Sequence, residues 1–141
     1  MRRFLLCFAF ALICKGAFAQ AIENKHEIDI QLQKCLDSTA NQTTVGMIDC
    51  TRRAMDAWDS ELNKYYKQLM NILSEEEKEK LKLAQQKWLL YRDTEISLAG
   101  TVFNNLQGTI WRIVAAERQM DIVKQRALGL KSYYETLKDE K

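Results

Sequence analysis

Proline is absent from this 141-residue chain, and the sequence contains only one histidine and five glycines. Without proline, nothing in the chain forbids long uninterrupted helices. The single histidine, His26, cannot assemble a His-based metal site and could supply at most one ligand to zinc. The sequence also has no Gly-rich phosphate loop and no serine-elbow motif. These absences remove the commonest signatures of an enzyme.

One apolar run stands at the N-terminus, behind the positively charged residues Arg2 and Arg3. The run covers residues 4–14 and is too short to span a bilayer as a mature anchor. Residues 17–19, Ala-Phe-Ala, form a small-x-small site suited to signal peptidase. We therefore predict a signal peptide over residues 1–19 and a single mature domain over residues 20–141. An uncleaved anchor is the alternative, whereas a lipoprotein is disfavoured because the large Ile13 precedes Cys14.

The predicted mature domain also lacks an excess of charge of either sign. Cleavage removes Arg2, Arg3 and Lys15 but no acid, so 21 basic residues become 18 against an unchanged 19 acidic residues, a formal net charge of −1. Export and this near-neutral balance both argue against nucleic acid as a partner. After cleavage we expect no stable membrane anchor.

Cysteine is scarce once the signal peptide is removed. Cys7 and Cys14 leave with it, so the mature domain keeps only Cys35 and Cys50. Two cysteines in an exported domain predict one disulfide. Two buried free thiols are the alternative, and a zinc site would need more ligands than His26 can add.

Apolar periodicity predicts an all-α fold, a small helical bundle built on a long αα-hairpin over residues 43–93. Residues 74–77, Ser-Glu-Glu-Glu, have the form of a capping box and mark a tight corner between the two helices. Apolar residues spaced three and four apart form a stripe along one face of the first helix. A shorter apolar stripe follows on the second helix, which is expected to run antiparallel to the first. The first stripe comprises Met47, Ala54, Met55, Trp58, Leu62, Tyr65, Tyr66, Leu69, Ile72 and Leu73, and the second Leu81, Ala84, Trp88 and Tyr91.

Two further helices flank this hairpin. A short helix is predicted over residues 27–37, followed by a turn-rich loop over residues 38–43 with Thr43 or Thr44 as the next N-cap. The hairpin's second helix should stop at Gly100, and Thr109 should cap a long last helix. That helix carries a heptad seam of Ile113, Ala116, Met120, Val123, Ala127, Leu130, Tyr134 and Leu137. Such a seam serves an intramolecular core or a dimer coiled coil, so monomer and dimer both stay open.

Polar residues on the hairpin are predicted to form a structural network. Asp59 and Asn63 lie one turn apart on the first helix, and Gln85, Arg92 and Asp93 lie on the second. Arg92 borders the apolar stripe, so its guanidinium should find a partner in Asp59 or Asn63 across the corner. We interpret the network as fixing the register of the helices, with partner binding as the alternative.

Two other arrangements could carry chemistry. Paired carboxylates occur at Asp56/Asp59 and at Asp93/Glu95, but acidic residues on exported helices are usually solvated. A Cys-His nucleophile would leave the other cysteine unpaired in an oxidising compartment. We therefore predict no catalytic residues, no metal and no cofactor.

Three groups of residues, in their order and spacing, carry a family resemblance. They are Cys35…Gln42-Thr43…Met47…Cys50, then Asp59-Ser60-Glu61-Leu62-Asn63…Tyr66, then Ala84-Gln85…Trp88…Tyr91-Arg92-Asp93-Thr94-Glu95. Together they resemble the LprI-type lysozyme-inhibitor family of exported bacterial proteins over roughly residues 35–130. The resemblance implies a disulfide-stapled helical domain in the periplasm or outside the cell and, for some members, inhibition of lysozyme.

The chain departs from the family pattern at two linked positions. Ile96 stands where many members have a cysteine, and Arg118 stands where a later helix offers another. Both halves of a second disulfide are therefore absent together. We expect Ile96 to fill the site by apolar packing.

A protein partner, lysozyme or another wall hydrolase, is what the resemblance implies. Lysozyme cleavage depends on two carboxylates in a cleft, so an inhibitor must occlude that cleft or offer donors to those acids. Acidic surface would assist association with basic animal lysozymes. The predicted contacts are Ser38, Thr39, Asn41 and Gln42 of the loop, and Glu75 and Glu76 of the corner. Other possibilities are an accessory envelope protein pairing through its C-terminal helix, and an immunity protein against a delivered toxin.

Overall fold

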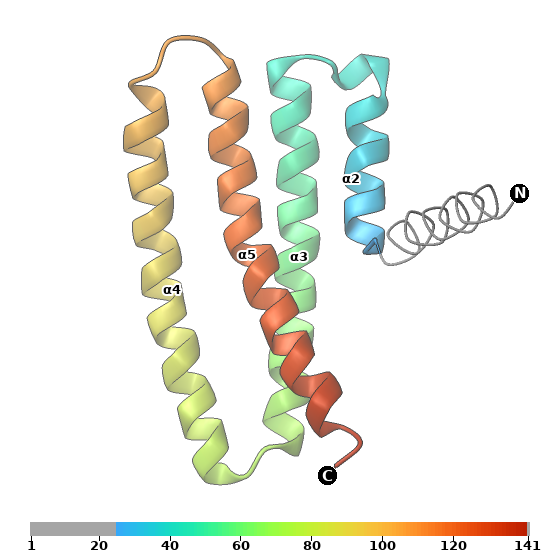
Figure 1. Cartoon of the computed structure of the whole chain (residues 1–141), viewed down its shortest axis with the longest axis vertical. Coiled ribbons are helices and arrows are strands. Elements are labelled where there is room, and N and C mark those ends of the chain that lie inside the picture. The colour runs from blue at the N-terminus through green and yellow to red at the C-terminus, as the bar shows by residue number, and fades with distance from the viewer. Residues whose placement is uncertain (1–24, 141) are drawn as a thin grey trace, which may run out of the picture.

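The computed structural model describes residues 25–140 and is helical almost throughout this range (Figure 1). The expected signal peptide lies outside the described residues. Within them the chain forms helix α2 (Glu27–Asp37), a short 3-10 turn η1 (Thr39–Asn41), and three long helices, α3 (Thr44–Ile72), α4 (Glu75–Asn104) and α5 (Ile110–Leu137), with no strand. The predicted all-α fold is confirmed.

In the upper half of Figure 1 the helices lie in the order α4, α5, α3 and α2, and lower down α5 crosses in front of α3. Helix α5 packs most extensively on α3 and also contacts α4, while α2 packs on α3. The predicted hairpin corner between α3 and α4 is present, but direct contact between these two helices is minor. The seam of α5 is longer and more continuous than the stripe of α4, so α5 covers the apolar face of α3 instead.

The core lies between α3 and α5. Trp58, Leu62 and Leu69 on α3 are each at most 2% exposed, and Leu130 on α5 is fully buried. The buried cluster includes Met120, Val123, Ala127 and Leu130 of the predicted seam. The seam therefore serves the core of the chain itself, as the intramolecular interpretation expected.

Helix α4 buries far fewer residues than α3 or α5. Its one buried residue is Ala99. Of its predicted stripe, Leu81 and Trp88 pack against the core, whereas Ala84 and Tyr91 are exposed. The helix also passes through Gly100 to Asn104, so the predicted stop at Gly100 is wrong. A glycine within a helix costs only about 1 kcal/mol, and the chain turns later, at Gly108 with φ of 100°.

Local capping signals position the helix starts. The Ser74 hydroxyl accepts from the Glu77 backbone amide at 3.4 Å, and a Glu77 carboxylate oxygen accepts from the Ser74 amide at 2.8 Å, completing the predicted capping box. Thr43 caps α3 by accepting from the Gly46 amide at 3.0 Å. Thr109 occupies the N-cap position of α5 but makes no capping hydrogen bond through its side chain.

Candidate functional site

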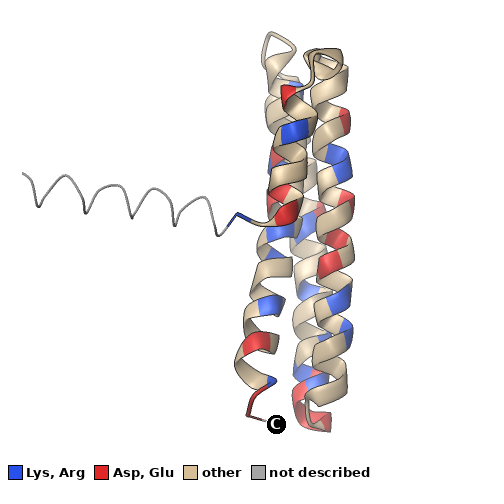
Figure 2. Cartoon of the chain, turned by 90° about the vertical axis from the view of Figure 1, so that its right-hand side faces the viewer, with Lys and Arg blue, Asp and Glu red and all other residues tan. Residues whose placement is uncertain are grey.

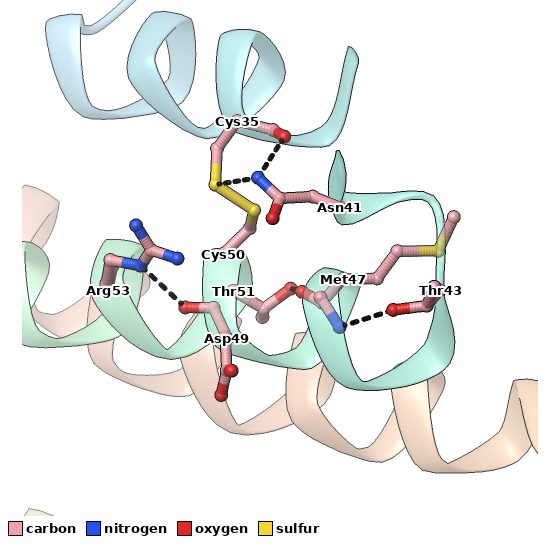
Figure 3. The surroundings of a disulfide bond; sticks show 9 residues. Cys35, Asn41, Thr43, Met47, Asp49, Cys50, Thr51 and Arg53 are labelled. Atoms are coloured by element: carbon pink, nitrogen blue, oxygen red, sulfur yellow. Dashed lines mark hydrogen bonds between the residues drawn. A yellow bond between two sulfur atoms is a disulfide. The ribbon is translucent and has the colours of Figure 1, made fainter. Parts of the chain in front are cut away.

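A disulfide between Cys35 and Cys50 joins α2 to α3, as predicted (Figure 3). The Asn41 side-chain amide donates to the Cys35 carbonyl oxygen at 3.0 Å and lies 3.5 Å from its sulfur. Below it, the buried Thr51 hydroxyl donates to the Met47 carbonyl oxygen at 2.9 Å. Residues 38–43, which we call the disulfide loop, are therefore held by a covalent bond and by hydrogen bonds.

The two predicted contact regions lie at opposite ends of the molecule (Figure 1). Ser38, Thr39, Asn41 and Gln42 belong to the disulfide loop at the start of α3, and Glu75 and Glu76 begin α4 beyond its far end. Because α3 has 29 residues, these ends are about 44 Å apart. A single small contact surface cannot contain both.

The two ends also differ in charge. The end with the disulfide loop carries the α4–α5 connection as well, and neither residues 38–43 nor residues 105–109 include a charged side chain (Figure 2). We call this the loop end. At the other end Glu75 pairs with Lys78 at 2.7 Å, and this hydrogen bond lowers the pKa of the Glu75 carboxyl. Glu75 of the acidic corner is thus already paired with a lysine of the same helix.

An open groove lies between α3 and α4 and has a volume of about 470 Å³. It lies between two helices that make little direct contact with each other. We call it the α3–α4 groove. Its lining includes Asp59, Leu62, Asn63 and Tyr66 from α3, and Lys82, Gln85, Gln86, Trp88, Leu89 and Arg92 from α4.

Four of the five residues predicted to form a polar network line this groove, but they do not bond across it. The Asn63 amide donates to an Asp59 carboxylate oxygen at 2.9 Å within α3. The Arg92 guanidinium donates to the neighbouring Asp93 carboxylate at 2.9 Å within α4. The expected pairing of Arg92 with Asp59 or Asn63 is therefore wrong. Each group bonds locally because α3 and α4 are held apart.

The partner of Gln85 is a residue that sequence reasoning missed. The Arg126 Nε of α5 donates to the Gln85 side-chain oxygen at 3.0 Å. Arg126 Nη2 is buried and has no hydrogen-bond partner among the described residues, and burial lowers the pKa of this guanidinium. Its sequence signal was its position beside the α5 seam, three residues after Val123 and directly before the buried Ala127.

A second missed cluster ties α2, α3 and α5 together. The Lys124 ammonium lies 2.8 Å from both carboxylate oxygens of Asp29 and 5.3 Å from the centre of the Trp58 ring. The His26 ring packs on the same indole at 4.3 Å, and its Nδ1 accepts from the Ile28 amide at 3.3 Å to cap α2. Asp29 and Lys124 are 95 residues apart, so no local pattern could pair them.

An ion pair involves one of the two positions, Ile96 and Arg118, at which the resemblance implied a cysteine. Arg118 Nη2 on α5 lies 3.1 Å from a Glu95 carboxylate oxygen on α4. Ile96, which was expected to pack apolarly, is half-buried. A polar contact between α4 and α5 is thus present in this chain where the pattern has a covalent one.

Residues 25–140 contain neither a metal-binding cluster nor a membrane-spanning helix. No cluster of three or more His, Cys, Asp or Glu side chains there is placed to hold a metal ion. In the same residues, no helix combines the length and apolar character that crossing a membrane requires.

Comparison with known proteins gives one family and a similar solved structure. The crystal structure of an uncharacterized protein from Burkholderia thailandensis is 26% identical to this chain, with a TM-score of 0.75. The similarity covers 79% of this chain and 55% of that protein, so this chain spans about half its length. No curated protein matches the sequence. The model described as "Lysozyme inhibitor LprI" matches residues 35–130, from the first disulfide cysteine to the last buried leucine of α5, and the chain therefore belongs to the LprI family.

Proposed function

We propose that this protein is exported to the bacterial envelope and inhibits a wall-degrading hydrolase such as lysozyme by steric blockade, without performing chemistry itself. The observation that carries the proposal is the family match over residues 35–130. The Cys35–Cys50 bond supports export, because disulfides persist in oxidising compartments.

The loop end is the surface we assign to the hydrolase cleft. Its side chains are uncharged and rich in amides and hydroxyls, which suits a cleft that binds sugar hydroxyl groups. The disulfide and the Asn41 hydrogen bonds hold the loop in one conformation, so little conformational entropy is lost on binding. The acidic corner, about 44 Å away along α3, would then act only through long-range attraction to a basic enzyme.

A wall-clearing assay with the chain over residues 20–141 tests the proposal. We expect lysozyme to be inhibited stoichiometrically, and absence of inhibition at micromolar excess would refute the function. Thr39→Arg and Gln42→Arg, at exposed loop positions, should weaken inhibition at least tenfold. Glu75→Arg and Glu76→Arg are matched charge-changing controls, and they should alter mainly the dependence of association on salt. Full inhibition by the loop variants would contradict the assigned surface.

An accessory envelope protein that pairs with another protein is a second candidate. The α5 seam expected to serve pairing is buried within the chain. Exposed leucines on α4 favour pairing there instead, since Leu83, Leu90 and Leu98 are each more than half exposed. Light scattering on the purified chain separates the candidates, because stable self-association through α4 would favour this one.

A further inference from the structure

We infer that the α3–α4 groove binds a glycan, with its long axis along α4. This function is separate from blockade of a hydrolase and uses a different surface, since the groove lies along the helices rather than at the loop end. Its volume of about 470 Å³ falls within the range of small-molecule sites. From Lys82 to Arg92 its α4 wall runs about 15 Å, which suits an oligosaccharide better than a single sugar.

Two aromatic rings supply flat apolar surfaces in the groove. Trp88 and Tyr66 line it from opposite walls, and both are only partly buried. The Arg92 guanidinium carbon lies 5.4 Å from the centre of the Trp88 ring, which orients the indole from one side. Pyranose rings have an apolar face of C–H groups that packs on such aromatic surfaces, while the Tyr66 hydroxyl remains a polar handle.

The charged groups of the groove are largely satisfied by their own neighbours. Arg92 pairs with Asp93 at 2.7 Å and Lys82 pairs with Glu79 at 2.6 Å. One carboxylate oxygen of Asp59 accepts from Asn63. An anionic or cationic ligand would therefore have to compete with ion pairs that already exist.

The neutral polar groups of the groove, in contrast, keep unused hydrogen-bonding capacity. Within residues 25–140, the Gln86 amide has no hydrogen-bond partner, and Gln85 uses only its oxygen. Asn63 uses only its amide nitrogen, so its side-chain oxygen is available. Amides that both donate and accept match the hydroxyl and acetamido groups of a neutral glycan.

A peptide is the competing ligand, and the lining disfavours it. An amphipathic helix would require a row of apolar contacts along the groove. Of the two aliphatic residues in the lining, Leu62 is 2% exposed and cannot be reached, which leaves Leu89. The remaining surface is aromatic and polar, which favours the glycan.

Titration of the intact chain with tetra-N-acetylchitotetraose tests this inference by calorimetry and by tryptophan fluorescence. We expect saturable binding with a change in emission that arises from Trp88, because Trp58 is 1% exposed and Trp111 lies near the loop end. Trp88→Phe should keep binding by calorimetry while losing the emission change. Binding by the parent chain to neither this oligosaccharide nor isolated wall glycan would overturn the inference.

Amide variants locate the site without disturbing the core. The double variant Asn63→Ala/Gln86→Ala changes two exposed side chains and should raise the dissociation constant about tenfold. Gln119→Ala, which removes an amide from a separate hollow lined by α3, α4 and α5, should change the dissociation constant less than twofold. Equal loss in both variants, or tighter binding of an acetylated tetrapeptide than of the glycan, would overturn the inference. Lysozyme inhibition by the double variant should be unchanged, so the two proposals fail independently.

Discussion

The backbone of Asn41 lies directly against Gly46, so closely that a Cβ added to Gly46 would stand 2.7 Å from the Asn41 Cα and carbonyl oxygen. The same glycine donates its backbone N–H to the capping hydroxyl of Thr43 at 3.0 Å. Because the atoms that the added Cβ would meet all belong to the Asn41 backbone and not to a flexible side chain, the loop cannot yield without moving as a whole. Gly46 therefore sets the position of the disulfide loop on α3.

Gly46→Ala should destabilise the protein by about 1–3 kcal/mol, the usual cost of overpacking. Chemical denaturation of the two proteins measures the difference. Gly129→Ala is the matched control, since nothing lies within 4 Å of its added Cβ, and in a helix interior it should stabilise by about 0.5–1 kcal/mol. Equal stability of Gly46→Ala and the parent would show that the loop shifts freely.

Replacement of both disulfide cysteines, as Cys35→Ala/Cys50→Ala, should lower the free energy of unfolding by about 3 kcal/mol. The bond links residues 15 positions apart, and most of this loss reflects the greater entropy of the unfolded chain. Denaturation with and without reductant checks it. Reductant should destabilise the parent but leave the double variant unchanged, and any effect on the variant would point to another cause.

The Lys124–Asp29 pair should contribute measurably to stability. Both side chains are less than a quarter exposed, and the pair joins α5 to α2. A double-mutant cycle with Asp29→Asn and Lys124→Met should give a coupling free energy of about 1 kcal/mol after allowance for solvent screening. The exposed pair Glu79–Lys82 is the control and should couple weakly. Similar coupling in both cycles would contradict the role of burial.

Arg126→Met should stabilise the protein by about 1 kcal/mol. The substitution removes the buried, unpartnered Nη2 and keeps an unbranched apolar chain, while the Gln85 oxygen it releases borders the α3–α4 groove and can be hydrated. Thermal unfolding measures the change. A loss of stability instead would mean that the hydrogen bond between α4 and α5 outweighs the cost of burying the guanidinium.

Local features of this fold could be predicted from the sequence because their signals lie within a few residues. The bounds of α2 at Glu27 and Asp37, the Thr43 cap and the Ser74 capping box all agree with the structure. The disulfide could be predicted because only two cysteines lie outside the predicted signal peptide. The helix bounds and caps depend only on residues that are neighbours in the chain, and two cysteines can pair in only one way.

The arrangement of the helices could not be predicted in the same way. The apolar stripes of α4 and α5 could each pack on the apolar face of α3, and periodicity alone does not predict which of the two helices does so. With α5 on that face, Arg92 bonds to the neighbouring Asp93 and not to Asp59, and Gln85 bonds to Arg126 of α5. The error in the polar network and the existence of the α3–α4 groove thus have one cause.

Helix α4 contributes Ala99 alone to the buried residues and packs chiefly on α5. The free energy that holds it in place is therefore a small fraction of the total, and its amide hydrogens should exchange by local detachment while α3 and α5 stay together. Such exchange would divide the molecule into two cooperative units, one of α2, α3 and α5 with the disulfide and the other of α4 alone. Any molecule that spans α3 and α4 would merge them into one.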